Sequence, residues 1–346
     1  MHKRRVEKPD GRYLYLYGHA PPAETAAAHS PTAPPPAPHL RWHPLRQEWV
    51  IYAAHRQDRT HLPPETRCPL CPARPDAPPG EIPFATFEIA VFQNRFPALT
   101  PTPPPPPDLP VPAAPAHGAC EVVVYTPEHT ASLATLPPQR RELLVRVWAD
   151  RYAELLAHPA VRYVMPFENR GEAVGVTLHH PHGQIYAYPF LPPVPEREAA
   201  AFREGPVLLR LLETAREGYT VLEDAHVQAF VPPFARFPYE VWVAPKRPHP
   251  GPWTFTDAET QSFARMLGEI AARYDALFQR PCPYLLALHA APKGTEAYYH
   301  FHAEFYPYLR APNKLKYLAG TEVGAGAFTV DVLPEVAAQA LRETRA

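Results

Sequence analysis

One short run of the sequence gathers several chemically active side chains. The run His179–Gln184 (HHPHGQ) ends an apolar, alternating stretch and is followed by Ile-Tyr-Ala. Side chains two residues apart on an extended strand point to the same face, so we expect His180, His182 and Gln184 to converge. A neutral imidazole can ligate a metal, accept a proton or attack as a nucleophile. The run therefore predicts a reactive or metal-binding site on a strand.

A second set of ligand residues lies upstream in the chain. Cys68 and Cys71 form a CxxC pair in an expected loop, and such a pair needs two further ligands to complete a tetrahedral zinc site. The remaining cysteines, Cys120 and Cys282, are expected to be ordinary buried thiols. Four cysteines with this spacing do not indicate a disulfide framework.

The bulk composition excludes several classes of protein. The 346 residues suffice for one large domain or two halves, and the formal net charge of -1 argues against a broad nucleic-acid-binding surface. No apolar run approaches the roughly 18 residues that span a bilayer, and the basic N-terminus lacks the apolar stretch of a signal peptide. We therefore expect a cytoplasmic protein that binds neither nucleic acid nor membrane.

Proline is unusually frequent, with 51 residues. Many of them fall in two Pro/Ala-rich segments, Pro21–Pro38 and Pro101–Pro115, which we expect to be extended, exposed and free of helix or sheet. Short strands are expected at Gly11–Tyr17 and Phe87–Phe92, and a turn followed by a strand within Arg41–Ala53.

The elements that must position the histidines occur twice. Each copy has a buried strand, an amphipathic helix and a strand that leads to a His-x-His pair. The first copy comprises Glu121–Tyr125, about Pro138–Leu156 and His180–Gln184, and the second comprises Glu240–Ala244, about Asp257–Phe278 and His300–Glu304. Arg151 precedes His180 by 29 residues, as Arg273 precedes His302. We interpret this as an internal duplication; the alternative is a chance similarity between two helices.

Short alternating strands and amphipathic helices favour an α+β fold, with a mainly antiparallel sheet covered by helices on one side. We expect three regions: an N-terminal strand with a Pro/Ala-rich segment (1–40), a first half with the CxxC pair and His182 (41–195), and a second half (196–346).

Three segments together resemble one known family: FENRGEAVGVTLHHPHGQIYA (Phe167–Ala187), RCPLCP (Arg67–Pro72) and FHAEFYP (Phe301–Pro307). From about Arg41 to Glu322 the chain resembles galactose-1-phosphate uridylyltransferase, of the histidine-triad group of nucleotidyltransferases. The resemblance implies two tandem histidine-triad-like halves and a homodimer that acts on UDP-glucose and galactose 1-phosphate.

The resemblance also implies roles for individual residues. His182 would carry the uridylyl group covalently in a ping-pong reaction, and Gln184 would bond a phosphate oxygen of that intermediate. Nucleotide-, phosphate- and sugar-contacting positions match Arg56, Arg59, Asn94, Asn169, Gly175 and Thr177. A segment that reaches the partner subunit's substrate matches Lys316, Tyr317, Ala319, Thr321 and Glu322.

Two metal sites follow from the same resemblance. A structural zinc site matches Cys68, Cys71, His129 and His180. A weaker second site, for iron or zinc, matches Glu198, His289, His302 and Glu304. Glu304 stands where the family often has histidine, which predicts an altered metal preference.

The sequence departs from the family pattern at several positions. Val176 replaces a cysteine, Thr177 stands where many members have serine, and Val323–Phe328 lacks a glutamine that contacts the hexose phosphate. His300 is expected to be a polar surface residue. The alternatives left open are a related phosphorylase that uses inorganic phosphate, a histidine-triad hydrolase, which Gln184 disfavours, and a zinc-stabilised binding module.

Overall fold

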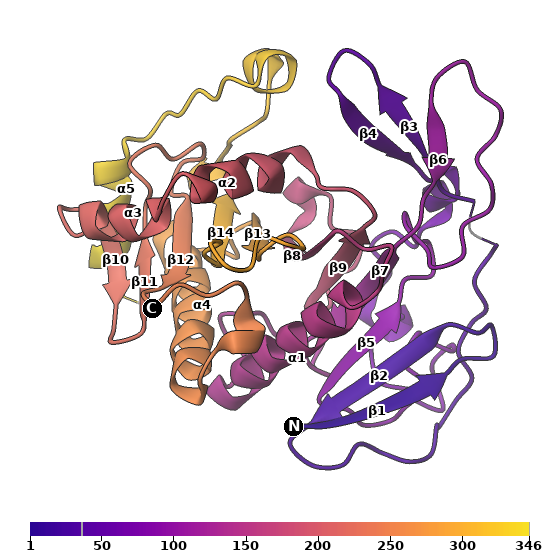
Figure 1. The fold of residues 1–346 in the computed structure, drawn as a ribbon. Helices are drawn as coiled ribbons and strands as arrows, with labels where there is room; N and C mark the ends of the chain where they lie inside the picture. Colours follow the sequence, from indigo (N-terminus) through magenta and orange to yellow (C-terminus); the bar gives the residue numbers. More distant parts are fainter. Residues whose placement is uncertain (36, 346) are drawn as a thin grey trace.

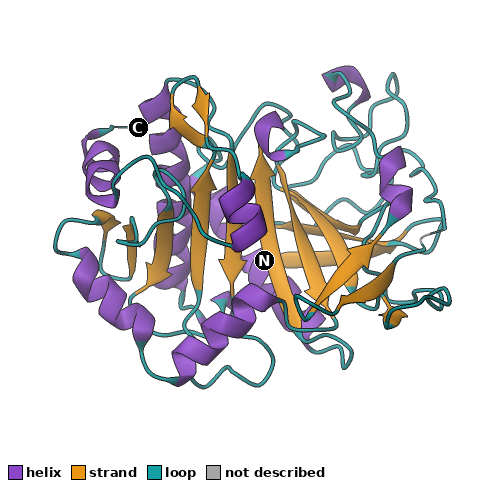
Figure 2. Ribbon diagram, turned by 90° about the horizontal axis from the view of Figure 1, so that it is seen from above, coloured by secondary structure: helices purple, strands orange, loops and turns teal. Residues whose placement is uncertain are grey.

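The computed structural model, which describes residues 1–35 and 37–345, is built on one sheet of eleven strands (Figures 1 and 2). Neighbouring strands are antiparallel throughout, as the sequence predicts. In spatial order they are β1 (His2–Glu7), β2 (Tyr13–Gly18), β5 (Ile89–Gln93), β7 (Ala119–Val124), β9 (His182–Tyr188), β8 (Tyr163–Arg170), β13 (Tyr284–His289), β14 (His302–Pro307), β12 (Val241–Pro245), β11 (Val227–Phe230) and β10 (Thr220–Glu223).

The predicted duplication is confirmed by the order of these strands. The halves meet where β8 pairs with β13, and the order β7-β9-β8 on one side mirrors β12-β14-β13 on the other. His180 Nε2 lies 2.8 Å from the Thr126 carbonyl, and His300 Nε2 lies 2.8 Å from the Pro245 carbonyl. His180 therefore corresponds to His300. The equal spacings of 29 residues from Arg151 and Arg273 had instead paired His180 with His302, which is wrong. The prediction that His300 is a surface residue is also wrong, because it is buried.

Two long helices pack side by side against one face of the sheet (Figure 1). They are α1 (Pro138–Leu156) and α4 (Asp257–Phe278), with the predicted bounds, and α5 (Pro334–Glu343) joins their apolar cluster. Thr256 begins α4 with a capping box that it forms with Glu259.

Helices also cover the opposite face of the second half, so the prediction of helices on one side alone is wrong. Along β11, Val227 and Ala229 pack in the cluster of α4, whereas Phe230 packs with α2 (Pro193–Arg203) and α3 (Val207–Ala215). Alternation along a strand explains how β11 faces both layers.

The first 18 residues belong to the main sheet. Arg151 of α1 donates two hydrogen bonds to Glu121 of β7, at 2.9 and 2.7 Å, and Tyr13 of β2 donates a third at 2.8 Å. Glu121 and Arg151 are both buried. Since a buried charge is stable only when paired and hydrogen-bonded, this cluster joins β2, β7 and α1.

A separate sheet of three strands lies in regions for which two of the sequence predictions are wrong. It contains β3 (His39–His43), β4 (Glu48–Tyr52) and β6 (Ala113–Pro115). The turn expected near Arg41 is therefore a strand. The second Pro/Ala-rich segment also ends in a strand, because β6 is an edge strand that pairs only with β3 and so tolerates proline. In the first such segment Pro36 lies outside the described residues, and its neighbours form neither helix nor strand. None of the described helices is long and apolar enough to span a membrane.

Candidate active site and metal clusters

The candidate nucleophile His182 is the first residue of β9. His182 and Gln184 alternate with the core residues Gly183 and Ile185, so both line one small cavity of about 100 Å³ beside β9. His180 precedes the strand, and one nitrogen of its ring faces Cys71. The same-face prediction therefore holds for His182 and Gln184 but is wrong for His180, since the two-residue repeat applies only within the strand.

The hydrogen bonds of His182 define which nitrogen can react. Its Nδ1 lies 2.7 Å from the His180 carbonyl oxygen, which can only accept, so Nδ1 carries the proton and Nε2 holds the free electron pair. Burial lowers the pKa of His182 below its ordinary value of 6.5. The ring is therefore neutral at neutral pH, the form in which imidazole is nucleophilic.

Gly183 lies between the two site residues and cannot carry a side chain without displacement of its neighbours. A Cβ there would lie 2.3 Å from the Tyr125 hydroxyl and 2.8 Å from the Phe167 carbonyl oxygen. We expect Gly183→Ala to shift β9 and lower kcat by about 100-fold, because a displacement of about 1 Å costs that much in a positioned site. Steady-state kinetics would measure this. Gly324→Ala, where the backbone does not have a positive φ and a Cβ meets nothing within 4 Å, is the control.

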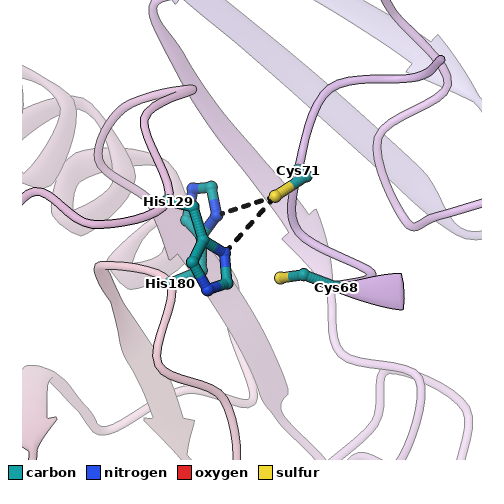
Figure 3. A group of neighbouring side chains, drawn as sticks. All are labelled: Cys68, Cys71, His129 and His180. Carbon is teal, nitrogen blue, oxygen red and sulfur yellow. Dashed lines mark hydrogen bonds between the residues drawn. The ribbon is translucent and has the colours of Figure 1, made fainter. Parts of the chain in front are cut away.

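The predicted CxxC site is assembled in the structure (Figure 3). Ligand atoms of Cys68, Cys71, His129 and His180 all lie within 4.8 Å of one another. Cys71 Sγ lies 3.4 Å from Nδ1 of His129 and 3.5 Å from Nδ1 of His180. A tetrahedral zinc ion with bonds of about 2.3 Å to sulfur and 2.0 Å to nitrogen separates such atoms by roughly 3.5 Å.

The two thiols of this cluster share a proton. Hydrogen bonds from Cys71 and His180 outweigh burial and lower the pKa of the Cys68 thiol to about 3, whereas the hydrogen bond with Cys68 and burial raise the pKa of the Cys71 thiol; a bound cation would favour the thiolate form of both. Thiolates, not thiols, bind metals, so these four side chains can hold a metal ion.

Two cavities meet at His182. The smaller one, described above, is also lined by Arg59, Asn94 and Thr177. The larger one, of about 640 Å³, is lined by Asn169, Arg170 and His129. His182 can therefore contact two bound groups, one on each side.

The other predicted substrate residues divide into two groups. Asn169, Asn94, Thr177 and Arg59 line the cavities. Gly175, with φ of 79°, ends the short helix before Thr177, a conformation that favours glycine. Arg56 instead donates to the Phe96 carbonyl and the Tyr186 hydroxyl, at 3.1 and 3.0 Å. In this chain it supports the wall of the site.

The segment Lys316–Glu322 folds on itself. Lys316 Nζ lies 2.7 Å from Glu322 Oε1, and both side chains are buried. Glu322 Oε2 also accepts from the Ala319 amide at 3.1 Å and the Thr321 hydroxyl at 2.9 Å. Tyr317 is 70% exposed. Ala319 and Thr321 are also exposed, so in a single chain these three residues are open to an external ligand, whereas the side chains of Lys316 and Glu322 are not.

The second predicted metal group is also assembled, in the second half. Ligand atoms of Glu198, His289 and His302 lie within 4.8 Å of one another, and Glu304 is 3.3 Å from His302 Nε2. Burial lowers the pKa of His289, but the carboxylates of Glu198 and Glu304 outweigh it and raise the pKa to about 9. The group thus carries excess negative charge that a cation would balance.

Comparison with known proteins identifies the family. The galactose-1-phosphate uridyl transferase N-terminal domain model matches residues 30–192, and the corresponding C-terminal domain model matches residues 202–346. The chain belongs to the galactose-1-phosphate uridylyltransferase family.

Relatives in this family align over most of the chain. A galactose-1-phosphate uridylyltransferase of Thermotoga maritima is 41% identical, over 88% of this chain and 98% of its own length. One of Haemophilus influenzae is 32% identical, over 88% of this chain and 94% of its own. A solved uridylyltransferase structure, 32% identical, superposes with a TM-score of 0.80 over 88% of this chain and 97% of that one.

Sequence reasoning missed Glu168, a buried carboxyl group in this uridylyltransferase-family site. Glu168 lines the larger cavity, accepts a hydrogen bond from Tyr284 at 3.1 Å, and has no partner for Oε2 among the described residues. Burial raises its pKa from 4.5 to about 7. The sequence FENRGE gave no signal that this glutamate is buried, because a charged residue beside cavity-lining residues is expected to be exposed to solvent in the cavity.

Glu168→Gln should stabilise the protein at high pH. The folded chain keeps a proton that the unfolded chain loses, so the free energy of unfolding falls as pH rises from 4.5 to about 7 and then levels. At about 1.4 kcal/mol per pKa unit, the variant should gain about 3 kcal/mol at pH 8 and little at pH 4.5. Denaturant unfolding at both pH values would measure this, and an equal change at both would contradict it.

Proposed function

We propose that this protein transfers a uridylyl group from UDP-glucose to galactose 1-phosphate, with glucose 1-phosphate and UDP-galactose as products. The observation that carries the proposal is the state of His182: a neutral ring at the junction of two cavities, with Nδ1 bound to a carbonyl and Nε2 free. Membership of the family supports the choice of substrates.

The reaction would proceed in two displacements. His182 Nε2 attacks the phosphorus next to uridine, a nitrogen–phosphorus bond forms, and the bond to the bridging oxygen breaks, so glucose 1-phosphate leaves. A phosphate oxygen of galactose 1-phosphate then attacks the same phosphorus and releases the imidazole. In the intermediate the ring is positively charged, and the His180 carbonyl accepts a hydrogen bond from its Nδ1.

Neighbouring polar groups would stabilise the phosphate during both steps, as electrostatic positioning does in phosphoryl transfer. Gln184 lines the small cavity with His182, and its buried Oε1 has no partner among the described residues. This oxygen would accept a hydrogen bond from a ribose hydroxyl, and the NH2 group of the same amide would donate to a phosphate oxygen. Arg59 adds a positive charge to that cavity, and Asn169 an amide to the larger one.

Zinc is the metal proposed for the cluster of Cys68, Cys71, His129 and His180, because two thiolates and two imidazoles complete its tetrahedral preference. This zinc ion would have a structural role, because four protein ligands fill its tetrahedral coordination and leave no position for substrate. Iron or zinc is proposed for the cluster in the second half.

The proposal extends to the organisation of the protein. Residues 41–195 would carry the reaction and the zinc, 196–346 the second metal, and 1–40 the N-terminal region whose strands β1 and β2 extend the main sheet. A cytoplasmic homodimer is proposed, in which Tyr317 and its segment complete the partner's site.

An acceptor panel tests this function. Purified protein would receive UDP-glucose labelled in the uridine, with galactose 1-phosphate, inorganic phosphate or water as acceptor. UDP-galactose formed only with the sugar phosphate supports the proposal. Product only with phosphate or water would instead indicate a phosphorylase or a hydrolase.

A further inference from the structure

The β1–β2 hairpin lies at one edge of the main sheet, beside β5, and precedes the part of the chain that the family models match (Figure 1). In β2, Leu14 and Leu16 belong to a buried apolar cluster that also contains Leu70, Phe92 and Val122. The last three residues line the small cavity beside β9. The hairpin therefore shares its apolar core with the walls of this cavity.

The turn of this hairpin holds two buried cations. Lys8 and Arg12 are only 4% and 6% exposed, and the Lys8 amide donates to the Arg12 carbonyl at 2.7 Å. Lys8 Nζ lies 2.6 Å from Glu81 Oε2, and Arg12 Nη1 lies 2.9 Å from the same oxygen. Arg12 Nε also donates to Asp10 at 2.7 Å. Two cations and two carboxylates thus form one cluster whose charges balance.

This charged cluster adjoins the small cavity. Glu81 lines the cavity, and its amide donates at 2.7 Å to the carbonyl of Pro69, which lines it as well. The Lys8 ammonium lies 4.5 Å from the centre of the Phe92 ring, another part of the cavity wall. Because Lys8 and Glu81 are both buried, water screens their charges from a ligand in the cavity only weakly.

Lys8 keeps its charge at neutral pH. Burial lowers its pKa from 10.5 to about 8, and the carboxylate of Glu81 opposes that fall. Without Lys8, the single charge of Arg12 would face the carboxylates of both Asp10 and Glu81, and the cluster would have one excess negative charge. Such a charge beside the cavity opposes the binding of an anionic ligand.

We propose that Lys8 and Arg12 of the β1–β2 turn neutralise Glu81 behind the small cavity and thereby permit a nucleoside diphosphate to bind there. Lys8 is a positioning residue in this role, because it acts on the ligand through Glu81 and through the wall that both support. The inference rests on the proposed function, which places the nucleotide in this cavity.

Binding of UDP to matched variants tests the inference. Lys8→Gln leaves one excess negative charge in the cluster, although its amide can still donate to Glu81. Lys8→Gln/Glu81→Gln removes both charges and restores the balance. Arg5→Gln, at an exposed position of β1, changes the net charge of the protein as Lys8→Gln does and is the control. Isothermal titration calorimetry at neutral pH would measure the affinity for UDP, and circular dichroism would follow folding.

Lys8→Gln should bind UDP about 10-fold more weakly than wild type. One uncompensated charge about 10 Å from an anion, at an effective dielectric constant of about 20, changes binding by roughly that factor. The double variant and Arg5→Gln should bind within about threefold of wild type, because the charges of the cluster stay balanced in both. If Lys8→Gln does not fold, Lys8→Met makes the same change of charge.

A role of the turn in folding alone predicts a different pattern. Lower stability of Lys8→Gln with an unchanged affinity of its folded form for UDP would overturn the inference. A double variant that binds as weakly as Lys8→Gln would also overturn it, since the balance of charge would then not matter. Wild type that does not bind UDP would overturn the proposed function and the inference together.

Discussion

His182→Ala should abolish uridylyl transfer, with a fall in kcat of at least about 10⁴-fold. Removal of a covalent nucleophile typically costs that much or more, because the remaining groups can position substrates but not form the intermediate. The KM values for both substrates should change little, since the cavity walls on either side stay in place. Steady-state kinetics with UDP-glucose and galactose 1-phosphate would measure both quantities.

His226→Ala is the matched control for this variant. His226 is exposed and lines neither of the two cavities that meet at His182. Its loss should change kcat less than about threefold. A His182→Ala protein that keeps a tenth or more of the wild-type rate would contradict a covalent role for this histidine.

Loss of the four-ligand cluster should have the second largest effect. Structural zinc contributes about 10 kcal/mol or more in peptides that fold around it, so Cys71→Ser should lower the free energy of unfolding by at least about 4 kcal/mol. It should also remove most activity, because His180 would be a ligand of that metal and its carbonyl accepts the hydrogen bond that holds His182.

A metal chelator should reproduce that loss in the wild type, and added Zn²⁺ should reverse it. Cys282→Ala is the control, because Cys282 is a buried free cysteine that lies outside the four-residue cluster and packs in the main hydrophobic core. Equal stability of Cys71→Ser and Cys282→Ala, or full activity after the zinc content reaches zero, would contradict a structural metal at this site.

The two long helices could be predicted from sequence, whereas the predicted strands differ from the observed ones by a residue or more at their ends. The approximate bounds of α1 and α4 follow from apolar periodicity, and the duplication follows from the repeated His-x-His strands. Layers could not be predicted, because β11 is buried on both faces and shows no alternation that would reveal α2 and α3.

The residues of the site could be predicted where their chemical type identifies them. The orientation of their side chains and the partners of their hydrogen bonds could not. The ligands of the CxxC cluster come together as expected. His180 is held outside the strand by a contact with the Thr126 carbonyl, which is distant in sequence. Which nitrogen of His182 is free depends on a hydrogen bond to the His180 carbonyl, which lies just before the strand. The buried pair of Lys316 and Glu322 was missed for a related reason: two charges six residues apart give no signal of burial until the loop closes on them.

Isolation of the covalent intermediate tests the central claim most directly. The protein would be mixed with UDP-glucose labelled in the uridine, without acceptor, and separated from free nucleotide. Label should remain on wild type, at up to one equivalent per chain, map to His182, and leave as UDP-galactose when galactose 1-phosphate is added. Absence of labelled protein in a preparation that turns over both substrates, or equal labelling of His182→Ala, would contradict the account.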